Sequence, residues 1–291
     1  MKTKETKGIL LVGGSGTRLM PLTSSVNKHL LPIYDKPMIF YSLSILMLSG
    51  IQNILIICRE IDILLFQNLL GDGSNFGLNI NYEIQDNPNG IGEAFLLGSD
   101  FIAQSNVSLM LGDNIFYGGQ LSQKLISAKN RVEGASIFAY EVNNPSNFGV
   151  VSFDSNNKIH SIEEKPKNPK SNYAVTGLYF YDNNVKDYAK SIKPSARGEL
   201  EITSINNIYL EQNNLFVEIM GRGFTWLDTG TIDSLVEASN FISIMQKQQG
   251  FNIACIEEIA FNNGWIDSEK LLALTHGKNS KYHSYIRNLI S

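Results

Sequence analysis

Cysteine is scarce in this sequence, and clusters of cysteine with histidine are missing. Only Cys58 and Cys255 occur, each within an apolar run, and no C-x-x-C spacing is present. We therefore expect both thiols to be reduced core residues, with neither a disulfide framework nor a zinc site of the cysteine type.

Long hydrophobic runs and an excess of positive charge are missing too. No segment approaches the ~20 apolar residues that span a bilayer, and the apolar stretch behind the basic start MKTKETK is too short for a signal-peptide core. A net charge of −4 argues against nucleic acid as the main partner. Together these absences predict a soluble, cytoplasmic protein that works with neither a membrane nor a nucleic acid.

A glycine-rich loop is the clearest feature that the sequence does contain. In ILLVGGSGTRLMPLT, residues 9–23, an apolar run typical of a buried parallel strand leads into Gly13, Gly14 and Gly16. Bare backbone amides form a nest for an anion, and the guanidinium of Arg18 adds a planar donor fork for phosphate. The loop matches neither the dinucleotide pattern G-x-G-x-x-G nor the P-loop pattern G-x-x-x-x-G-K-[ST]. It predicts a phosphate site of another kind, with a mobile surface turn as the alternative.

Strand-like and helix-like runs alternate between residues 9 and 111, which indicates βαβ units and a parallel sheet. Residues 134–182 are richer in strands and predict a mixed-sheet lid grown on the first half. We expect an α/β fold with a central mixed, mostly parallel sheet flanked by helices. Residues 1–249 would form the main domain, and residues 250–291 a helical C-terminal extension for packing or regulation.

Two aspartates follow apolar strands and could share a metal. Asp113 ends SLMLGDN, and Asp228 lies in TWLDTGT before a helical pattern. Ligands of open α/β sheets bind outside the carboxyl ends of the strands, so both carboxylates can face the crevice of the glycine loop. Two carboxylates with phosphate oxygens suit Mg²⁺, and Lys28 can add a point charge if its segment folds back over the loop. The alternatives are a turn or a helix cap for the aspartates and an ordinary solvated lysine.

A second polar group suits a sugar phosphate. Glu164 and Lys165 end the strand pattern of SIEEKP, and Arg197 follows in SARGELEIT. A carboxylate can bind sugar hydroxyls while the two cations hold a phosphate, and the alternative is a solvated charged rim. Gln85, after NYEI, carries an amide donor and acceptor that could read a pyrimidine edge.

The same stretches, in this order and over nearly the whole chain, resemble the sugar-phosphate nucleotidylyltransferases. The matching motifs are GGSGTRLMPLT, NKHLLPIYDKPMI, LGDN, EEKP, NYAVTGLYFYD, RGELEIT and WLDTGT. The first is shared across the family, whereas the stretch from NYAVTGLYFYD to WLDTGT is particular to the branch that uses thymidine nucleotides. The chain departs from the usual pattern at Val12, where alanine is commoner, at Asn27-Lys28-His29, and at Gly92-Glu93, where Ala-Gln is typical.

The resemblance implies a Rossmann-like nucleotide-diphospho-sugar transferase fold and Mg²⁺-dependent transfer of a thymidylyl group from dTTP to glucose 1-phosphate. The products would be dTDP-glucose and pyrophosphate, formed by direct in-line attack. It also implies a homotetramer that opens a deoxysugar pathway and is inhibited by a late product such as dTDP-L-rhamnose. The alternatives are another nucleotide (UTP, CTP or ATP) on the same fold and a non-catalytic regulator that binds nucleotide sugars.

The resemblance further implies a role for each matching residue. Nucleotide binding would involve Gly13, Gly14, Ser15, Gly16, Thr17, Arg18, Lys28, Gln85, Gly90 and Asp113. Catalysis would depend on Arg18, Lys28 and Asp113, and metal binding on Asp113 and Asp228. The sugar phosphate would contact Gly149, Glu164, Lys165, Val175 and Arg197. A second, regulatory site would involve Tyr117, Gly118, Arg222, Glu257, Glu258 and Ile259.

Overall fold

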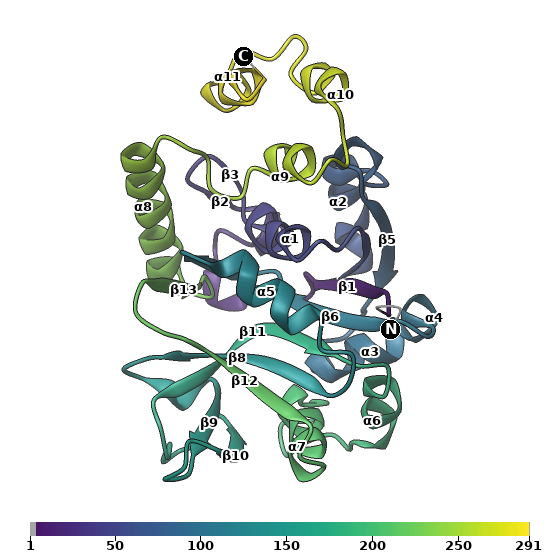
Figure 1. Cartoon of the computed structure of the whole chain (residues 1–291), viewed down its shortest axis with the longest axis vertical. Coiled ribbons are helices and arrows are strands. Elements are labelled where there is room, and N and C mark those ends of the chain that lie inside the picture. Colours follow the sequence, from purple (N-terminus) through teal and green to yellow (C-terminus); the bar gives the residue numbers. More distant parts are fainter. Residues whose placement is uncertain (1–3, 291) are drawn as a thin grey trace.

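A nine-stranded sheet runs through the middle of the computed structural model, which describes residues 4–290 (Figure 1). Strands β5, β4, β1 and β6 are parallel neighbours, while β11 runs antiparallel to β6 on one side and to β8 on the other. β12 joins β8 in parallel, and the hairpin β9–β10 pairs with the first half of β11. The expected mixed, mostly parallel sheet is therefore confirmed. Its strands are β1 (Thr6–Leu11), β4 (Asn53–Cys58), β5 (Asn79–Ile84), β6 (Asn106–Leu111), β8 (Ala135–Glu141), β9 (Gly149–Phe153), β10 (Ile159–Glu164), β11 (Tyr173–Tyr181) and β12 (Leu215–Met220).

Helices cover both faces of this sheet, as Figure 1 shows. One face carries α1 (Ile39–Leu48), α2 (Ile63–Leu70), α5 (Leu121–Lys129) and α9 (Ile256–Asn262). The other carries α3 (Ala94–Leu97), α4 (Ser99–Ile102), α6 (Val185–Ser191) and α7 (Ile202–Glu211). The remaining strands form the pairs β2 (Pro32–Ile33) with β3 (Lys36–Pro37) and β7 (Asn114–Gly118) with β13 (Phe224–Asp228). The remaining α-helices are α8 (Ile232–Gln249), α10 (Ser268–Ala273) and α11 (Lys281–Asn288).

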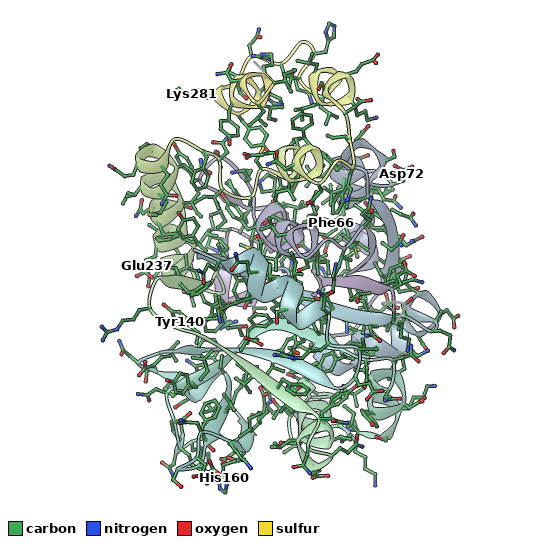
Figure 2. All side chains as sticks on the ribbon, in the orientation of Figure 1. Phe66, Asp72, Tyr140, His160, Glu237 and Lys281 are labelled. Carbon is green, nitrogen blue, oxygen red and sulfur yellow. The ribbon has the colours of Figure 1, made fainter. Side chains whose placement is uncertain are left out.

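The apolar runs of the sequence explain these two layers. The inner parallel strands are almost continuous aliphatic runs because both of their faces are covered. Helix α1 is apolar on nearly all sides, and every residue from Ile39 to Met47 is buried, because it lies between the sheet and α9. Side chains fill both layers, with Phe66 inside and Asp72, His160, Glu237 and Lys281 at the surface (Figure 2).

Two details differ from the sequence pattern. Residues 90–102, GIGEAFLLGSDFI, have the sequence pattern of a single helix, but the structure divides them into a 3-10 helix (Ile91–Glu93), α3 and α4, with α3 and α4 separated at Gly98. A Cβ on Gly98 would come within 2.9 Å of Cδ1 of Ile9, so the close approach to β1 requires glycine there. The sequence pattern did not predict helix α5, because LSQKLISAK offers only a short apolar stripe.

The tail after Gly250 is helical, as expected, and α9 buries Ile256 and Ala260 in the same core as α1. The division of the chain at residues 249 and 250 stays a prediction. Within residues 4–290, none of the helices combines the length and the hydrophobicity that a membrane crossing requires.

Candidate active site

The glycine loop leaves the end of β1 and forms one wall of a cavity of about 220 Å³, the smaller cavity. Gly13 and Gly14 line it, and Gly14 has a left-handed φ of 86°, which favours glycine. A Cβ on Gly13 would stand 2.9 Å from Oε1 of Gln85, so that amide can approach only a bare backbone. The loop therefore has the exposed backbone that its sequence predicts.

The same loop carries Arg18 to an adjoining cavity of about 700 Å³, the larger cavity. Arg18 lies in the 3-10 helix Thr17–Leu19, and a Cβ on Gly230 would be 2.9 Å from its Nη2. The guanidinium thus lies beside the turn that follows Asp228. The expected nucleotide residues Ser15, Gly16 and Thr17 are not among the residues that line either cavity. The two cavities share Ile91, Leu111, Asp113 and Glu199. We call this shared region, together with the interacting charged residues Lys28, Arg18 and Asp228, the junction.

Gln85 follows β5 in the smaller cavity, is 7% exposed, and has a fixed amide orientation. Its Nε2 donates to Oε2 of Glu93 at 2.7 Å, and Oε1 of Glu93 accepts from Nδ2 of Asn89 at 2.8 Å. A carboxylate only accepts hydrogen bonds, so the nitrogen of the Gln85 amide must face Glu93. The amide oxygen is left beside Gly13, in a cavity that Gly90 also lines.

Lys28 and His29 enter the smaller cavity from the 3-10 helix Lys28–Leu30. Nζ of Lys28 lies 2.5 Å from Oδ2 of Asp113, so this segment does fold back over the glycine loop. Burial, together with the ammonium of Lys28, lowers the pKa of His29 to about 3. The imidazole is therefore neutral at physiological pH.

Pairing of β7 with β13 brings the two aspartates together. The antiparallel register sets Asp228 opposite Asn114, the residue after Asp113. Nδ2 of Asn114 donates to Oδ1 of Asp113 at 2.9 Å. Oδ1 of Asn114 accepts from the backbone N–H of Gly177 at 2.9 Å and from Nε1 of Trp226 at 2.7 Å. Asn114 thus joins the strands of both aspartates to β11.

The two carboxylates titrate as an unequal pair. Burial opposes ionisation of Asp113, but the ammonium of Lys28, as a charge and as a hydrogen-bond donor, holds its pKa well below the usual range. Burial and then the charge of Asp113 raise the pKa of Asp228 to about 6, against the attraction of Lys28, Arg18 and Lys165. In the part of the chain that the structure describes, no three His, Cys, Asp or Glu side chains are grouped as metal ligands. Asp113 and Asp228 thus form a pair of interacting carboxylates in this part of the structure.

The larger cavity contains the residues expected around a sugar phosphate. Its lining includes Gly149, Glu164, Lys165, Val175 and Arg197. Oε2 of Glu164 accepts from Oγ1 of Thr203 at 2.5 Å, which fixes the carboxylate against α7. A Cβ on Gly149 would lie 3.6 Å from the same oxygen, so the carboxylate stands over open backbone.

Arg197 is held by carboxylates within this cavity. Its Nη2 lies 2.7 Å from Oε2 of Glu201, and its Nε donates to Oε1 of Glu201 at 3.1 Å. Glu199 and Glu164 lie 3.3 Å and 3.4 Å from Nη2. Sequence reasoning missed Glu201, although its place four residues after Arg197 in RGELE was a usable signal. It also missed the lining residues Tyr179, Thr203 and Trp226, which look like ordinary strand and helix residues.

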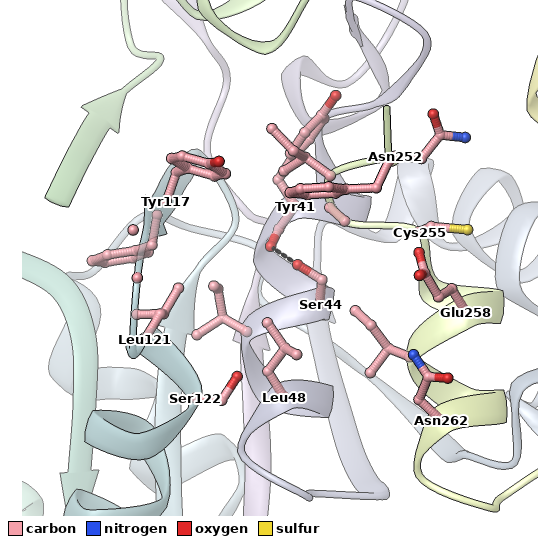
Figure 3. A pocket seen from close by; sticks show the side chains of 18 of the residues that line it. Tyr41, Ser44, Leu48, Tyr117, Leu121, Ser122, Asn252, Cys255, Glu258 and Asn262 are labelled. Atoms are coloured by element: carbon pink, nitrogen blue, oxygen red, sulfur yellow. Dashed lines mark hydrogen bonds between the residues drawn. The ribbon is translucent and has the colours of Figure 1, made fainter. Parts of the chain in front are cut away.

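A third cavity of about 550 Å³ lies between α1, the β7–α5 turn and the start of the C-terminal extension, and we call it the α9 cavity (Figure 3). Tyr117, Gly118, Glu258 and Ile259, four of the six residues expected at a regulatory site, line it. Arg222, in the turn before β13, and Glu257, which accepts from the hydroxyl of Tyr282, are not among its lining residues. None of the residues described here as lining the α9 cavity lines the smaller or the larger cavity.

The family model and the relatives found by comparison with known proteins agree on one family for this chain. Residues 7–244 match the family model described as nucleotidyl transferase. A glucose-1-phosphate thymidylyltransferase from Neisseria meningitidis serogroup A is 56% identical over 98% of this chain and 99% of its own length. The enzyme of the same name from Mycolicibacterium smegmatis is 52% identical over the same shares of the two chains.

Solved structures agree with the sequence comparison. A Bacillus anthracis structure assigned as a glucose-1-phosphate thymidylyltransferase, in complex with sucrose, superposes with a TM-score of 0.76 at 43% identity, covering 81% of this chain and 95% of that one. A UDP-glucose pyrophosphorylase complexed with UDP-glucose gives a TM-score of 0.72 at 23% identity over 83% of this chain and 99% of that one, which speaks for the fold alone.

Proposed function

Because this chain belongs to the nucleotidyl transferase family, and within it to the glucose-1-phosphate thymidylyltransferases, we propose that it transfers a thymidylyl group from dTTP to glucose 1-phosphate. The products are dTDP-glucose and pyrophosphate. The observation that carries the proposal is the junction, where cations and two carboxylates lie between a cavity ending in an amide and a cavity rich in hydroxyl-binding groups.

The fixed amide of Gln85 supports a thymine or uracil base. Its free oxygen can accept a hydrogen bond from N3–H, which both of these bases carry. Cytosine presents an acceptor at N3 and adenine an acceptor at N1, so either would place a lone pair against the oxygen. We therefore expect UTP to serve as a weaker substrate and CTP and ATP to be poor ones.

The reaction needs no base, because the phosphate oxygen of glucose 1-phosphate is already anionic. One P–O bond forms to the α-phosphorus while the bond to the departing pyrophosphate breaks, and no proton has to move. The amides of Gly13 and Gly14 and the ammonium of Lys28 position the triphosphate, and Arg18 stabilises the charge that builds on the leaving group.

Asp113 and Asp228 fit a magnesium ion. Their donor set is all oxygen, and Mg²⁺ is usually held by one or two carboxylates together with water and phosphate oxygens. When bound, the ion would neutralise phosphate charge. Asn114 and the β7–β13 pair hold the two carboxylates in place for it.

In the larger cavity, Glu164 would accept hydrogen bonds from sugar hydroxyls over the bare backbone of Gly149. Lys165 and Arg197 would contact the sugar phosphate, and Val175 would close the apolar side of the site. The roughly threefold difference between about 700 Å³ and about 220 Å³ suits a sugar phosphate in one cavity and a planar base in the other.

A pyrophosphate-release assay with glucose 1-phosphate, Mg²⁺ and each nucleotide in turn tests this proposal. We expect the highest kcat/KM with dTTP and a lower value with UTP. A preference for ATP or CTP would refute the base assignment. The absence of release with all four nucleotides would support a non-catalytic regulator instead.

A second proposal concerns the α9 cavity, which would bind a late nucleotide sugar such as dTDP-L-rhamnose and lower turnover. Tyr41 lines this cavity, and its hydroxyl donates to the backbone oxygen of Ile33 at 2.8 Å, five residues after Lys28. A ligand that moves Tyr41 can therefore act on the segment that carries Lys28.

The homotetramer implied by the resemblance is likewise a proposal, which the mass of the protein in solution tests.

Filling the α9 cavity tests the regulatory proposal. Ile259→Trp should abolish inhibition by dTDP-L-rhamnose and leave uninhibited turnover near that of the wild type, since allostery needs two separate sites. Arg222→Ala tests whether the neighbouring turn takes part. Competitive inhibition of equal strength in the wild type and in Ile259→Trp would place the inhibitor in the smaller or the larger cavity.

A further inference from the structure

A buried chain of polar side chains runs from the end of β4 to the turn that carries Lys28. Nε and Nη2 of Arg59 lie 2.6 Å and 3.1 Å from Oδ2 and Oδ1 of Asp62. Oδ2 of Asp62 also accepts from Nδ2 of Asn27 at 2.7 Å. Asp62 is 2% exposed and Asn27 is 1% exposed, so the bond between these two residues is shielded from water.

Every hydrogen-bonding position of the Asn27 amide is used. Its Nδ2 donates to Asp62 and to the backbone oxygen of Val12 at 3.2 Å, at the start of the glycine loop. Its Oδ1 accepts from the backbone N–H of His29 at 2.9 Å and lies 2.8 Å from Nδ1 of the same residue. Asn27 thus caps the 3-10 helix Lys28–Leu30 at its N-terminus.

Asp62 and the backbone oxygen of Val12 together decide which way that amide points, and the bond to Asp62 is the shorter of the two. A carboxylate can only accept, so the nitrogen of Asn27 must face Asp62 and the oxygen must face the turn. With the amide reversed, the nitrogen would confront the N–H of His29 and the turn would lose its cap. The orientation of the Asn27 amide is therefore set in part by Asp62, a residue that lines neither the smaller nor the larger cavity.

We propose that Asp62 is a positioning residue for the transfer reaction: acting through Asn27, it holds the turn Lys28–Leu30 so that the ammonium of Lys28 stays at the junction. This inference rests on the proposed function. It assigns a role in turnover to a carboxylate that belongs to the α2 side of the sheet and touches no substrate.

The alternative is that Asp62 only stabilises the fold where β4 meets α2. Asp182 provides a matched control, because it is also a buried carboxylate with side-chain and backbone donors. It accepts from the hydroxyl of Tyr209 at 2.7 Å and from the N–H of Gly134 at 2.7 Å, after the end of β11. Asp182 lines neither the smaller nor the larger cavity, so Asp182→Ala should lower stability alone.

The test is a double-mutant cycle on the full-length protein, with steady-state kinetics and thermal unfolding. Asp62→Ala and Asn27→Ala should each lower kcat/KM for dTTP by about 100-fold, the cost of a displacement near 1 Å. The double variant should be no slower than Asn27→Ala alone, because the two residues act in series. The KM for glucose 1-phosphate should stay within about twofold, since the larger cavity is untouched. Asp62→Asn, which keeps an oxygen in place for Asn27, should recover most of the activity.

Three outcomes would overturn the proposal. They are additive losses in the double variant, equal losses in Asp62→Asn and Asp62→Ala, and an Asp62→Ala enzyme whose folded fraction has normal kcat/KM, as expected for Asp182→Ala. If the wild type transfers no nucleotide at all, the proposed function fails first. Calorimetric titration with dTTP then still tests Asp62, because weaker binding by Asp62→Ala than by Asp182→Ala supports positioning and equal binding refutes it.

Discussion

The smaller cavity is built from the ends of parallel strands, whereas the larger cavity is built from side chains on antiparallel strands and α7. In the smaller cavity, bare backbone at Gly13 and Gly14 and a short turn at Lys28 do most of the shaping. In the larger cavity, Glu164, Arg197 and Glu201 hold one another through ion pairs and hydrogen bonds. The shape of the smaller cavity depends on the path of the backbone, and the shape of the larger cavity depends on which side chains contact one another.

This difference has a consequence for mutation. A backbone-built site loses function when a residue that steers the chain is changed, even one remote from substrate. A side-chain-built site changes its affinity for one substrate at a time, since each partner can be removed separately. Variants of Arg18, Asp113 or Asp228 should affect both substrates, whereas variants that act within one cavity should affect one substrate.

The largest effect is expected at the junction. Arg18→Ala should lower kcat by about 10³-fold, because cation stabilisation of a phosphoryl-transfer transition state can contribute that much. Arg18 is exposed, so the variant should fold normally, and Lys278→Ala, which removes an exposed cation at the far end of the chain, is the control. Turnover within a few-fold of the wild type would mean that Arg18 does not face the leaving group. Asp113→Asn and Asp228→Asn should be comparably slow in the same pyrophosphate-release assay.

In the larger cavity, Glu201→Ala should raise the KM for glucose 1-phosphate by about tenfold, the worth of a charge-assisted hydrogen bond. Arg197 would lose the carboxylate that orients its guanidinium. The KM for dTTP should not change. Asp187→Ala is the matched control, because it removes a carboxylate from the exposed pair with Lys190. A parallel rise in both KM values for Glu201→Ala would contradict the separation of the two cavities.

In the smaller cavity, Glu93→Ala should reduce the preference for dTTP over CTP by about tenfold, since the amide of Gln85 could then turn either way. The measurement is the ratio of the two kcat/KM values, which a general loss of stability would not alter. Asn89→Ala removes the other partner of Glu93 and should leave the ratio unchanged. An unchanged ratio in Glu93→Ala would show that Gln85 is oriented by something else.

The smallest effect concerns stability and pH. Burial and Asp113 raise the pKa of Asp228 from its usual 3.8 to about 6, so the folded protein binds this proton more tightly than the unfolded chain. The stability contributed by the protonated group is fully present below pH 3.8 and is lost as the pH rises through about 6. Without metal, Asp228→Asn should therefore have a Tm a few degrees above that of the wild type at pH 7, and nearly equal to it at pH 4. A constant difference across this range would contradict the assignment.

The backbone-built half of the crevice was largely predictable from sequence. An aliphatic run followed by glycines sets a strand end and a bare turn, and the parallel order sets Asp113 at the same edge as Gly13. Each of these signals lies within one short stretch of sequence and can be read there. The strands of the central sheet and most helices followed from the same kind of pattern, whereas β2, β3 and β7 did not.

The remaining features depend on segments that meet only after folding. Glu93 departs from the usual family pattern, and its role became visible only when its carboxylate lay against Gln85. Asp62 and Asn27 are 35 residues apart and look like ordinary turn residues until burial forces them to pair. No periodic pattern of the sequence indicates such a pairing.

Strand β11 lines the larger cavity and pairs with β6, whose last residue, Leu111, also lines the smaller cavity, and this limits how the enzyme can move. Tyr173 and Ala174 pair with β9, while Leu178 to Tyr181 pair with β6 on the same side. A rotation of the part that contains the larger cavity about a hinge would break the hydrogen-bond ladder of this strand. Closure over substrates must therefore come from loops at the rim, and amide hydrogen exchange should be slow along β11 with or without ligands.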